Sequence, residues 1–449
     1  MAIGSSAQTV NTIHNFNGSD GSNPANLTLV QGRDAALYGA TVYGGTNDIG
    51  VIFKITPAGK FTVLRNMYGA TDGAYPSSLT LAYDGNFYGT TESGGTGDYG
   101  TIFKISPSGT FTVLHNFNGN GSEGSEPATP PIQASDGNFY GTTDFGGTGN
   151  SGTVYKLTPA GALTVLYNFD PAGGGSGSAT GMPTQGGDGY LYTLEANGGA
   201  SSCGRILKIS TAGVLTNTYD FDCETTGRVP VGKLVRGADG NLYGTTLHGG
   251  IYNCGTGYCE GGLLFQLETN FSYTVLYDFG GKIGEGTEPV GSVVGSDGRF
   301  YGNDTAGGDF GYGTIYRYSL NGVSNDLYSW SSDVEPAGLT QHTSGAFYGA
   351  NYKGGTSNVG TVFNMNVRLS PFIALVQSQG KTGSTAQILG QGLTGTTSVT
   401  FNGVAATKFS VVSDTYMTAV VPSGVSIGPV VVTTPSGVLK SNKNFRISQ

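Results

Sequence analysis

A short signature recurs seven times along this chain at intervals close to fifty residues. Each copy centres on a tyrosine, usually in the order Tyr-Gly-Thr-Thr, and a Gly-Gly pair follows it a few residues later. The seven tyrosines are Tyr38, Tyr88, Tyr140, Tyr192, Tyr243, Tyr301 and Tyr348, with spacings of 50, 52, 52, 51, 58 and 47 residues. A fixed period of this size predicts a repeat architecture, in which each unit buries its apolar face only against its neighbours.

The second copy shows the internal plan of a repeat. Four short segments rich in β-branched and aromatic residues lie between Gly, Pro and Asp turn signals, at residues 78–82, 86–91, 100–105 and 111–117. We name the corresponding strands a, b, c and d in every repeat. Four short antiparallel strands repeated radially predict a β-propeller, and no segment carries a capped helical period.

The two ends of the repeat array complement each other. The seventh repeat contains strands a to c and then changes composition, whereas residues 11–16 match the strand d of other repeats. We therefore predict an all-β fold over residues 1–367, a seven-bladed propeller in which residues 9–16 complete the seventh blade. Residues 368–449 contain short alternating strands separated by turns, which predict a small immunoglobulin-like β-sandwich.

Two resemblances follow from these segments. The repeat, seen in residues 84–91 and continuing to Phe117, resembles the tandem GloVer repeat of secreted and surface-anchored bacterial proteins, over roughly residues 9–366. The resemblance implies export and carries no catalytic residues. Residues 401–406 and 421–430 look like an IPT/TIG domain, an immunoglobulin-like module that serves as a spacer or binding unit.

Composition narrows the classes of partner. The 449 residues carry a net charge of −9 and no basic patch, which argues against nucleic acid as a partner. The sequence contains no run of eighteen apolar residues, so no membrane span is predicted. The N-terminal residues lack a signal-peptide pattern, so the protein is either cytosolic or has lost its signal peptide. The resemblance favours a secreted or cell-surface protein, and we expect a monomer.

The four cysteines lie in loops of two neighbouring repeats, without histidines nearby. We predict two disulfides, Cys203–Cys223 and Cys254–Cys259, in an oxidising compartment. A zinc site is the alternative, although the Cys-x-x-Cys spacing is absent.

Candidate functional residues are those that break the repeat pattern on one face. Strand alternation places the b–c and d–a loops on the same face of the disc. The second Thr of the signature becomes Glu195, Asp304 and Asn351 in three repeats, and His248 lies in the repeat between the first two. We predict Glu195 and Asp304, which we expect at the exposed rim of this face, as catalytic acid and base, with His248 assisting. The neighbouring residues that we expect to bind substrate are Tyr43, Glu92, Asp144, Phe145, Asn197, Asn351, Tyr352 and Lys353.

Acids and amides beside aromatic rings suit a sugar, which presents hydroxyl groups and an apolar ring face. The sequence therefore predicts a polysaccharide-acting enzyme, a glycoside hydrolase, with a lyase using His248 and Tyr352 or Lys353 as a variant. An inverting mechanism fits better, since it separates its carboxyls by roughly 6.5–9.5 Å. The alternative is a glycan-binding or surface-structural protein without catalysis. We predict no cofactor and no metal; the acids of the d–a loops indicate calcium only weakly, because no Asp-x-Asp-x-Asp spacing occurs.

Overall fold

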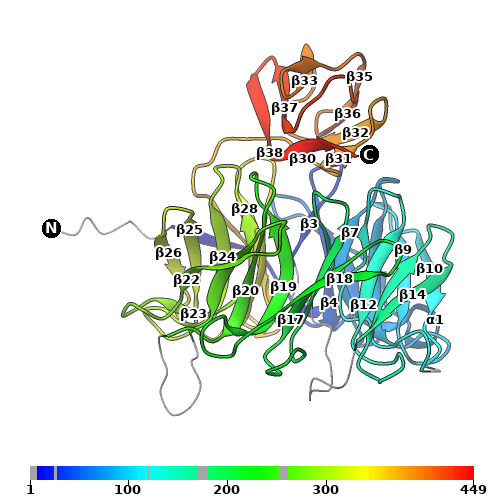
Figure 1. Ribbon diagram of the computed structural model, residues 1–449, viewed down its shortest axis with the longest axis vertical. Coiled ribbons are helices and arrows are strands. Elements are labelled where there is room, and N and C mark those ends of the chain that lie inside the picture. Colours follow the sequence, from blue (N-terminus) through cyan, green and yellow to red (C-terminus); the bar gives the residue numbers. More distant parts are fainter. Residues whose placement is uncertain (1–7, 25–27, 120, 170–180, 252–260, 449) are drawn as a thin grey trace.

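The computed structural model describes residues 8–24, 28–119, 121–169, 181–251 and 261–448. The described chain is almost entirely β-structure, and its single helix is the one-turn α1 (Gly69–Asp72). Figure 1 shows the sheets of the repeat region standing side by side, with the C-terminal sheets stacked on one end of the array. The architecture is propeller-like, as the repeat period predicts.

Each of the seven repeats forms one antiparallel sheet in the order a, b, c, d. The a strands are β3 (Val30–Gln31), β7 (Ala74–Leu81), β11 (Ile132–Gln133), β15 (Thr184–Gln185), β19 (Arg228–Arg236), β23 (Gly286–Val294) and β27 (Pro336–Gln341). The b strands are β4 (Leu37–Tyr43), β8 (Phe87–Ser93), β12 (Phe139–Thr143), β16 (Leu191–Glu195), β20 (Leu242–His248), β24 (Phe300–Gly307) and β28 (Phe347–Asn351). The short β2 (Ser22–Pro24) extends strand a of the first sheet along β4.

The outer half of every sheet consists of strands c and d. The c strands are β5 (Val51–Ile55), β9 (Thr101–Ile105), β13 (Thr153–Leu157), β17 (Arg205–Ile209), β21 (Leu263–Leu267), β25 (Thr314–Ser319) and β29 (Thr361–Met365). The d strands are β6 (Phe61–Asn66), β10 (Phe111–Asn116), β14 (Leu163–Asn168), β18 (Leu215–Asp220), β22 (Tyr273–Asp278), β26 (Val323–Ser329) and, from the start of the chain, β1 (Val10–Asn15). Antiparallel pairing of β1 with β29 joins the two ends of the repeat region.

The signature tyrosine connects three parts of the structure. In the second repeat its ring is buried and stacks on Phe139 of the next sheet, with 4.0 Å between ring centroids. Its hydroxyl donates a hydrogen bond of 3.0 Å to Asp84 in the a–b turn of its own sheet. Six of the seven tyrosines donate to an aspartate four residues earlier in this way. The tyrosine thus fixes a turn, a strand and the contact with the next sheet.

The glycine after the tyrosine makes room for an aromatic ring. A Cβ atom at Gly89 would lie 2.5 Å from the ring of Phe103, the residue opposite it on strand c. In the fourth sheet the glycine is replaced by Thr193, and the residue opposite is Leu207 instead of an aromatic. The two positions therefore change together, which explains why the signature reads Tyr-Gly in the other repeats.

The C-terminal segment forms two sheets that share one apolar core. One sheet has the order β30 (Ala374–Leu375), β32 (Thr385–Leu389), β36 (Tyr416–Val420), β35 (Phe409–Ser413). The other has the order β31 (Gln379–Gly380), β38 (Gly437–Ile447), β37 (Gly428–Thr434), β33 (Ser398–Phe401), β34 (Val404–Ala405). Phe401, Met417, Val430 and Phe445 are fully buried in the core between them.

These sheets dock on the a–b turns of the repeats, at the end of the array opposite the b–c loops (Figure 1). The Arg33 guanidinium donates to Gln387 at 2.8 Å and lies 4.5 Å from the ring centroid of Tyr416. At another a–b turn, in the fifth repeat sheet, Asn444 donates to the backbone carbonyl of Ala238 at 2.8 Å. The predicted functional face therefore lies away from the C-terminal sheets.

Replacing Phe16 by alanine tests the closure by the N-terminal strand. Phe16 follows β1 and is fully buried against Phe53 and Val362, which belong to the first and last sheets. We expect the substitution to lower the free energy of unfolding by about 3–5 kcal/mol, the usual cost of removing a buried phenylalanine ring. Thr12→Ala, on the exposed side of β1, is the control. Equal urea midpoints for the Phe16 variant and the wild type would contradict this account of closure.

Candidate functional site

The end of strand b, where the sequence predicts the site, carries a repeated buried hydrogen bond. In the second and third sheets the second Thr of the signature bonds a Thr at the start of strand c, Thr91 to Thr101 at 2.9 Å and Thr143 to Thr153 at 3.0 Å. Asn351 in the seventh sheet donates to Thr361 at 3.2 Å in the same way. This position therefore joins strands b and c inside each sheet and does not lie at the rim.

Asp304 takes the place of the threonine in the sixth sheet. It is fully buried and accepts a hydrogen bond of 2.7 Å from Thr314, while its Oδ1 has no hydrogen-bond partner among the described residues. Burial raises the pKa of its carboxyl well above the ordinary value; the Thr314 hydrogen bond opposes the shift, and the charges of Asp326 and Glu285 add to it. The sequence analysis placed Asp304 at the exposed rim, and the structure corrects that placement.

Glu195 in the fourth sheet is also buried, because it occupies the same position at the end of strand b. Its carboxylate forms an ion pair with Arg205, the first residue of strand c, and the glycine of the following loop, Gly198, packs over it. The ion pair replaces the Thr–Thr hydrogen bond of the other sheets. Glu195 and Asp304 thus each bind a partner on strand c of their own sheet.

His248, Asn197 and Phe145, which the sequence predicted on the same face, lie in different segments. His248 is the last residue of β20, half-buried and opposite Arg228 of strand a. Asn197 is half-buried in the loop after β16. Phe145 is half-buried, and its backbone pairs with Ser125 of the d–a loop.

Four groups on the same face are close enough to interact electrostatically. Glu92 of the second sheet acts electrostatically on Glu126 and Asp144 of the third sheet and on Tyr352 of the seventh. Glu126 is one of six residues that precede a proline in the d–a loops with positive φ; the others are Asn23, Tyr75, Val229, Glu288 and Glu335. The carboxyls of Glu92, Glu126 and Asp144 therefore lie within electrostatic range of one another.

Burial is the main cause of the unusual titration of Asp144. Together with the charges of Glu92 and Glu126, it raises the pKa of the Asp144 carboxyl to about 7. Its Oδ1 is buried without a hydrogen-bond partner in the described structure. This site thus holds a carboxylic acid whose affinity for its proton is raised by burial and by the neighbouring carboxyl groups.

Aromatic rings border these carboxyls. Tyr43 is 40% exposed and makes an edge-to-face contact with Tyr75, with centroids 5.3 Å apart. Burial raises the pKa of Tyr352, and the charges of Tyr43 and Glu335 add to the shift. Lys353 forms ion pairs with Asp333, at 3.2 Å, and with Glu335. We define the tyrosine–carboxylate cluster as Tyr43, Glu92, Glu126, Asp144, Glu335 and Tyr352.

Sequence reasoning selected four members of this cluster as substrate-binding residues and assigned Glu126 and Glu335 only to the d–a acids. It missed Tyr75 altogether. The signal was present in the sequence, since Tyr75, Glu126 and Glu335 all precede the proline that opens strand a. Four of the other d–a acids have structural partners on strand d. Asp20 contacts His14 at 3.1 Å, Glu123 contacts His115 at 3.4 Å, and Asp72 and Glu285 bond Arg65 and Tyr277.

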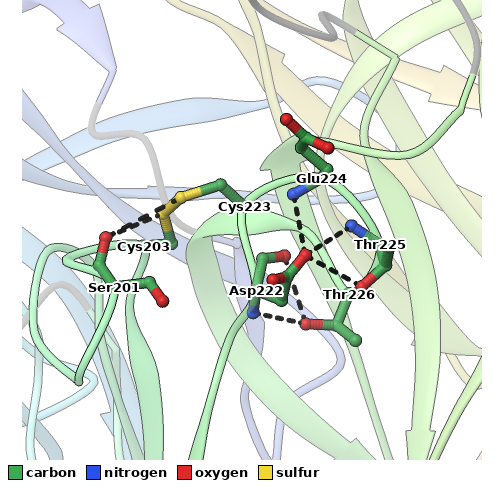
Figure 2. Close-up of a disulfide and its surroundings, with 7 residues drawn as sticks. All are labelled: Ser201, Cys203, Asp222, Cys223, Glu224, Thr225 and Thr226. Atoms are coloured by element: carbon green, nitrogen blue, oxygen red, sulfur yellow. Dashed lines mark hydrogen bonds between the residues drawn. A yellow bond between two sulfur atoms is a disulfide. The ribbon is translucent and has the colours of Figure 1, made fainter.

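The disulfide Cys203–Cys223 forms as predicted, with 5.3 Å between the Cα atoms. It ties the b–c loop of the fourth sheet to the loop that leads into the fifth (Figure 2). Beside it Asp222 caps the turn by accepting hydrogen bonds from the backbone amides of Glu224 and Thr225, at 3.2 and 3.0 Å. Closing a loop of this size contributes about 3 kcal/mol to stability. The predicted pair Cys254–Cys259 lies outside the described residues.

No set of three or more His, Cys, Asp or Glu side chains within the described ranges is arranged to hold a metal ion. The described chain also contains no helix that is both long and apolar enough to cross a membrane. Trp330, which follows strand d of the sixth sheet, is buried and packs edge-to-face on Phe363, 5.2 Å between centroids.

The Gloeobacter/Verrucomicrobia repeat family matches residues 2–187 and 110–259. Together the two matches span more than half of the chain, so the protein belongs to this family. No curated protein has a significantly similar sequence.

Solved structures share the fold at low sequence identity. A streptogramin B lyase is 16% identical, with a TM-score of 0.55 over 80% of this chain and 98% of its own. A catalytically inactive virginiamycin B lyase from Staphylococcus aureus with quinupristin is 15% identical, with a TM-score of 0.56 over 80% and 99%. A fungal alcohol oxidase of the AA5 family in complex with copper is 12% identical, with a TM-score of 0.54 over 99% of both chains. These likenesses establish the fold alone.

The buried position of Asp304 makes a specific prediction about stability. Because its pKa is raised on folding above the ordinary value of 3.8, the native state loses stability relative to an uncharged variant as the pH rises. We expect Asp304→Asn to unfold at the same urea concentration as the wild type below pH 4 and at a higher one at pH 7. Asp309→Asn, at an exposed loop position, is the control, and we expect its urea midpoint to differ from that of the wild type by the same amount at both pH values. A variant that is less stable than the wild type at pH 7 would contradict the burial argument.

Proposed function

We propose that this member of the Gloeobacter/Verrucomicrobia repeat family is an exported, seven-bladed β-propeller that binds polysaccharide through the tyrosine–carboxylate cluster. The observation that carries the proposal is the grouping of the Tyr43 and Tyr352 rings with the carboxyls of Glu92, Glu126 and Asp144, on the face that the C-terminal sheets leave open. Rings supply an apolar platform for a sugar face, and carboxyls accept hydrogen bonds from hydroxyl groups.

Other features support the remaining parts of this proposal. The Cys203–Cys223 disulfide is typical of an oxidising compartment and favours export. The seven sheets with the β1–β29 pair account for seven blades in a closed ring, and the two C-terminal sheets fit an immunoglobulin-like module of the IPT/TIG kind. We propose a monomer with this module as a spacer.

The charge of the cluster restricts the ligand. With Glu92, Glu126 and Asp144 on one side and a net charge of −9 over the chain, a polyanionic glycan would be repelled. Neutral polysaccharides and polymers of amino sugars are therefore the expected ligands.

Binding to immobilised polysaccharides, followed by calorimetry on the best ligand, tests the proposal. We expect Tyr43→Ala and Tyr352→Ala each to weaken the affinity by roughly 2- to 10-fold, the value of one lost aromatic contact. Tyr68→Ala is the matched control, because Tyr68 is 51% exposed but follows the outer strand β6. Absence of binding to every glycan, or an equal loss in the control, would contradict the proposal.

A second function, glycan cleavage, is favoured by the pKa of Asp144. A carboxyl that keeps its proton near pH 7 beside a second carboxyl is the pairing that general acid–base catalysis uses. In this assignment Asp144 is the acid and Glu92 the base. The competing assignment is the one made from sequence, with Glu195, Asp304 and His248.

Release of reducing ends from the bound polysaccharide distinguishes these possibilities. If Asp144 is the acid, turnover falls as the pH rises through about 7, because the proton is lost there. Asp144→Asn then lowers kcat by about 10²–10⁴-fold, while Asp304→Asn retains activity. Loss of turnover in a folded Asp304→Asn or Glu195→Gln variant would instead support the sequence-based assignment, and no turnover on any bound glycan leaves binding as the function.

A further inference from the structure

The end of the ring that the C-terminal sheets cover encloses a cavity of about 350 Å³. Its wall is formed by the a strands, with residues such as Leu79, Val290 and Leu339, and its roof by Val376 and Leu389 of the C-terminal sheets. This volume lies within the range of small-molecule sites. Most of the lining is apolar, as such sites require.

A second cavity of about 210 Å³ adjoins the first. The two share Met182, Lys233, Val376 and Lys443 as lining residues, so both lysines stand where the cavities meet. Lys233 comes from a part of β19 in which the pairing register shifts between Val231 and Val235. Such a shift releases the intervening residues from regular pairing and redirects their side chains.

Positive charge gathers at this junction without a counter-charge. Lys443 lies on β38, and Arg236, which donates to Ser378, follows Lys233 on β19. Arg446 is close enough to act electrostatically on Arg236. In the described part of the chain no carboxylate forms an ion pair with any of these four cations, although most other lysines and arginines of the repeats pair with an acid.

The surroundings of the lysines penalise their charge. Burial lowers the pKa of Lys233, and burial together with the charges of Lys233 and Arg236 lowers the pKa of Lys443 to about 8. Lys443 keeps solvent-accessible surface and is one of the residues that line both cavities. The titratable groups that line the two cavities are Lys233, Arg236, Lys443 and Tyr83, and none of them is a carboxyl group.

We propose that this cavity binds a small amphipathic organic anion, with a carboxylate or phosphate head against Lys233 and Lys443 and an apolar body among the a strands. Unpaired cations in a protein interior cost free energy, and an anion with matching charge removes that cost. Solvation by water alone would explain the cations but not the adjoining apolar wall of Leu79, Val290 and Leu339, which favours the body of a ligand. The site lies at the opposite end of the ring from the tyrosine–carboxylate cluster and is independent of it.

Thermal unfolding of the full chain with millimolar sodium octanoate tests the site, with octyl glucoside and sodium phosphate as uncharged and headgroup-only probes. We expect octanoate to raise the melting temperature in a concentration-dependent way, since a ligand that binds only the folded state stabilises it. Lys443→Met should weaken octanoate binding at least tenfold. The matched control is Lys440→Met, a lysine on the same strand that lines neither cavity. If Lys443→Met does not fold, Lys233→Met serves in its place.

Calorimetry of octanoate binding in buffers of different ionisation enthalpy gives an independent readout. At pH 9 the free Lys443 amine is mostly neutral and the bound one charged, so binding should take up about one proton. No proton uptake, no stabilisation by octanoate, or equal weakening in Lys440→Met would overturn the proposal. Stabilisation by phosphate equal to that by octanoate would overturn the apolar part of the site.

Discussion

The hydrogen bond from the signature tyrosine to the a–b turn is the interaction on which the rest of this structure depends. It fixes the turn that joins strands a and b, and the buried ring of the same tyrosine forms the contact with the next sheet, as Tyr88 does with Asp84 and Phe139. Since the a–b turns also carry the C-terminal sheets, the same bond sets the surface on which they dock. In the seventh sheet, Ser344 stands in place of the aspartate, and the turn bonds His342 instead, which is buried and bonds the carbonyl of Ala35.

Particular residues show which features of the structure could be predicted from the sequence. The repeat period and the turn residues were sufficient to predict the all-β fold and the Cys203–Cys223 disulfide. Glu195 and Asp304 were noticed correctly as exceptions but placed at the rim. Their burial follows from the residue ten positions later, Arg205 or Thr314, which stands where Thr101 pairs with Thr91. Comparing both members of each pair along the sequence would have revealed this.

Other features depend on distances that a repeat pattern does not contain. Lys233 and Lys443 belong to different parts of the chain, and only the docking of the C-terminal sheets brings them to the same cavity. The ring therefore has two chemically different ends. One is open, aromatic and acidic, around Tyr43 and Asp144; the other is covered, apolar and cationic. A single ligand would not suit both, which is why we assign them separate roles.

The pairing of β1 with β29 has a consequence for how the protein is made. Asn15 pairs with Thr361, so β1 is synthesised long before the strand with which it pairs. At about 5–20 residues per second, synthesis of the intervening chain takes roughly 20–70 s. During that interval the six sheets between them can assemble in sequence, each against its predecessor, while β1 stays unpaired. Until then β1 has no partner strand, and its unpaired backbone groups need protection from other chains until the last strand c arrives.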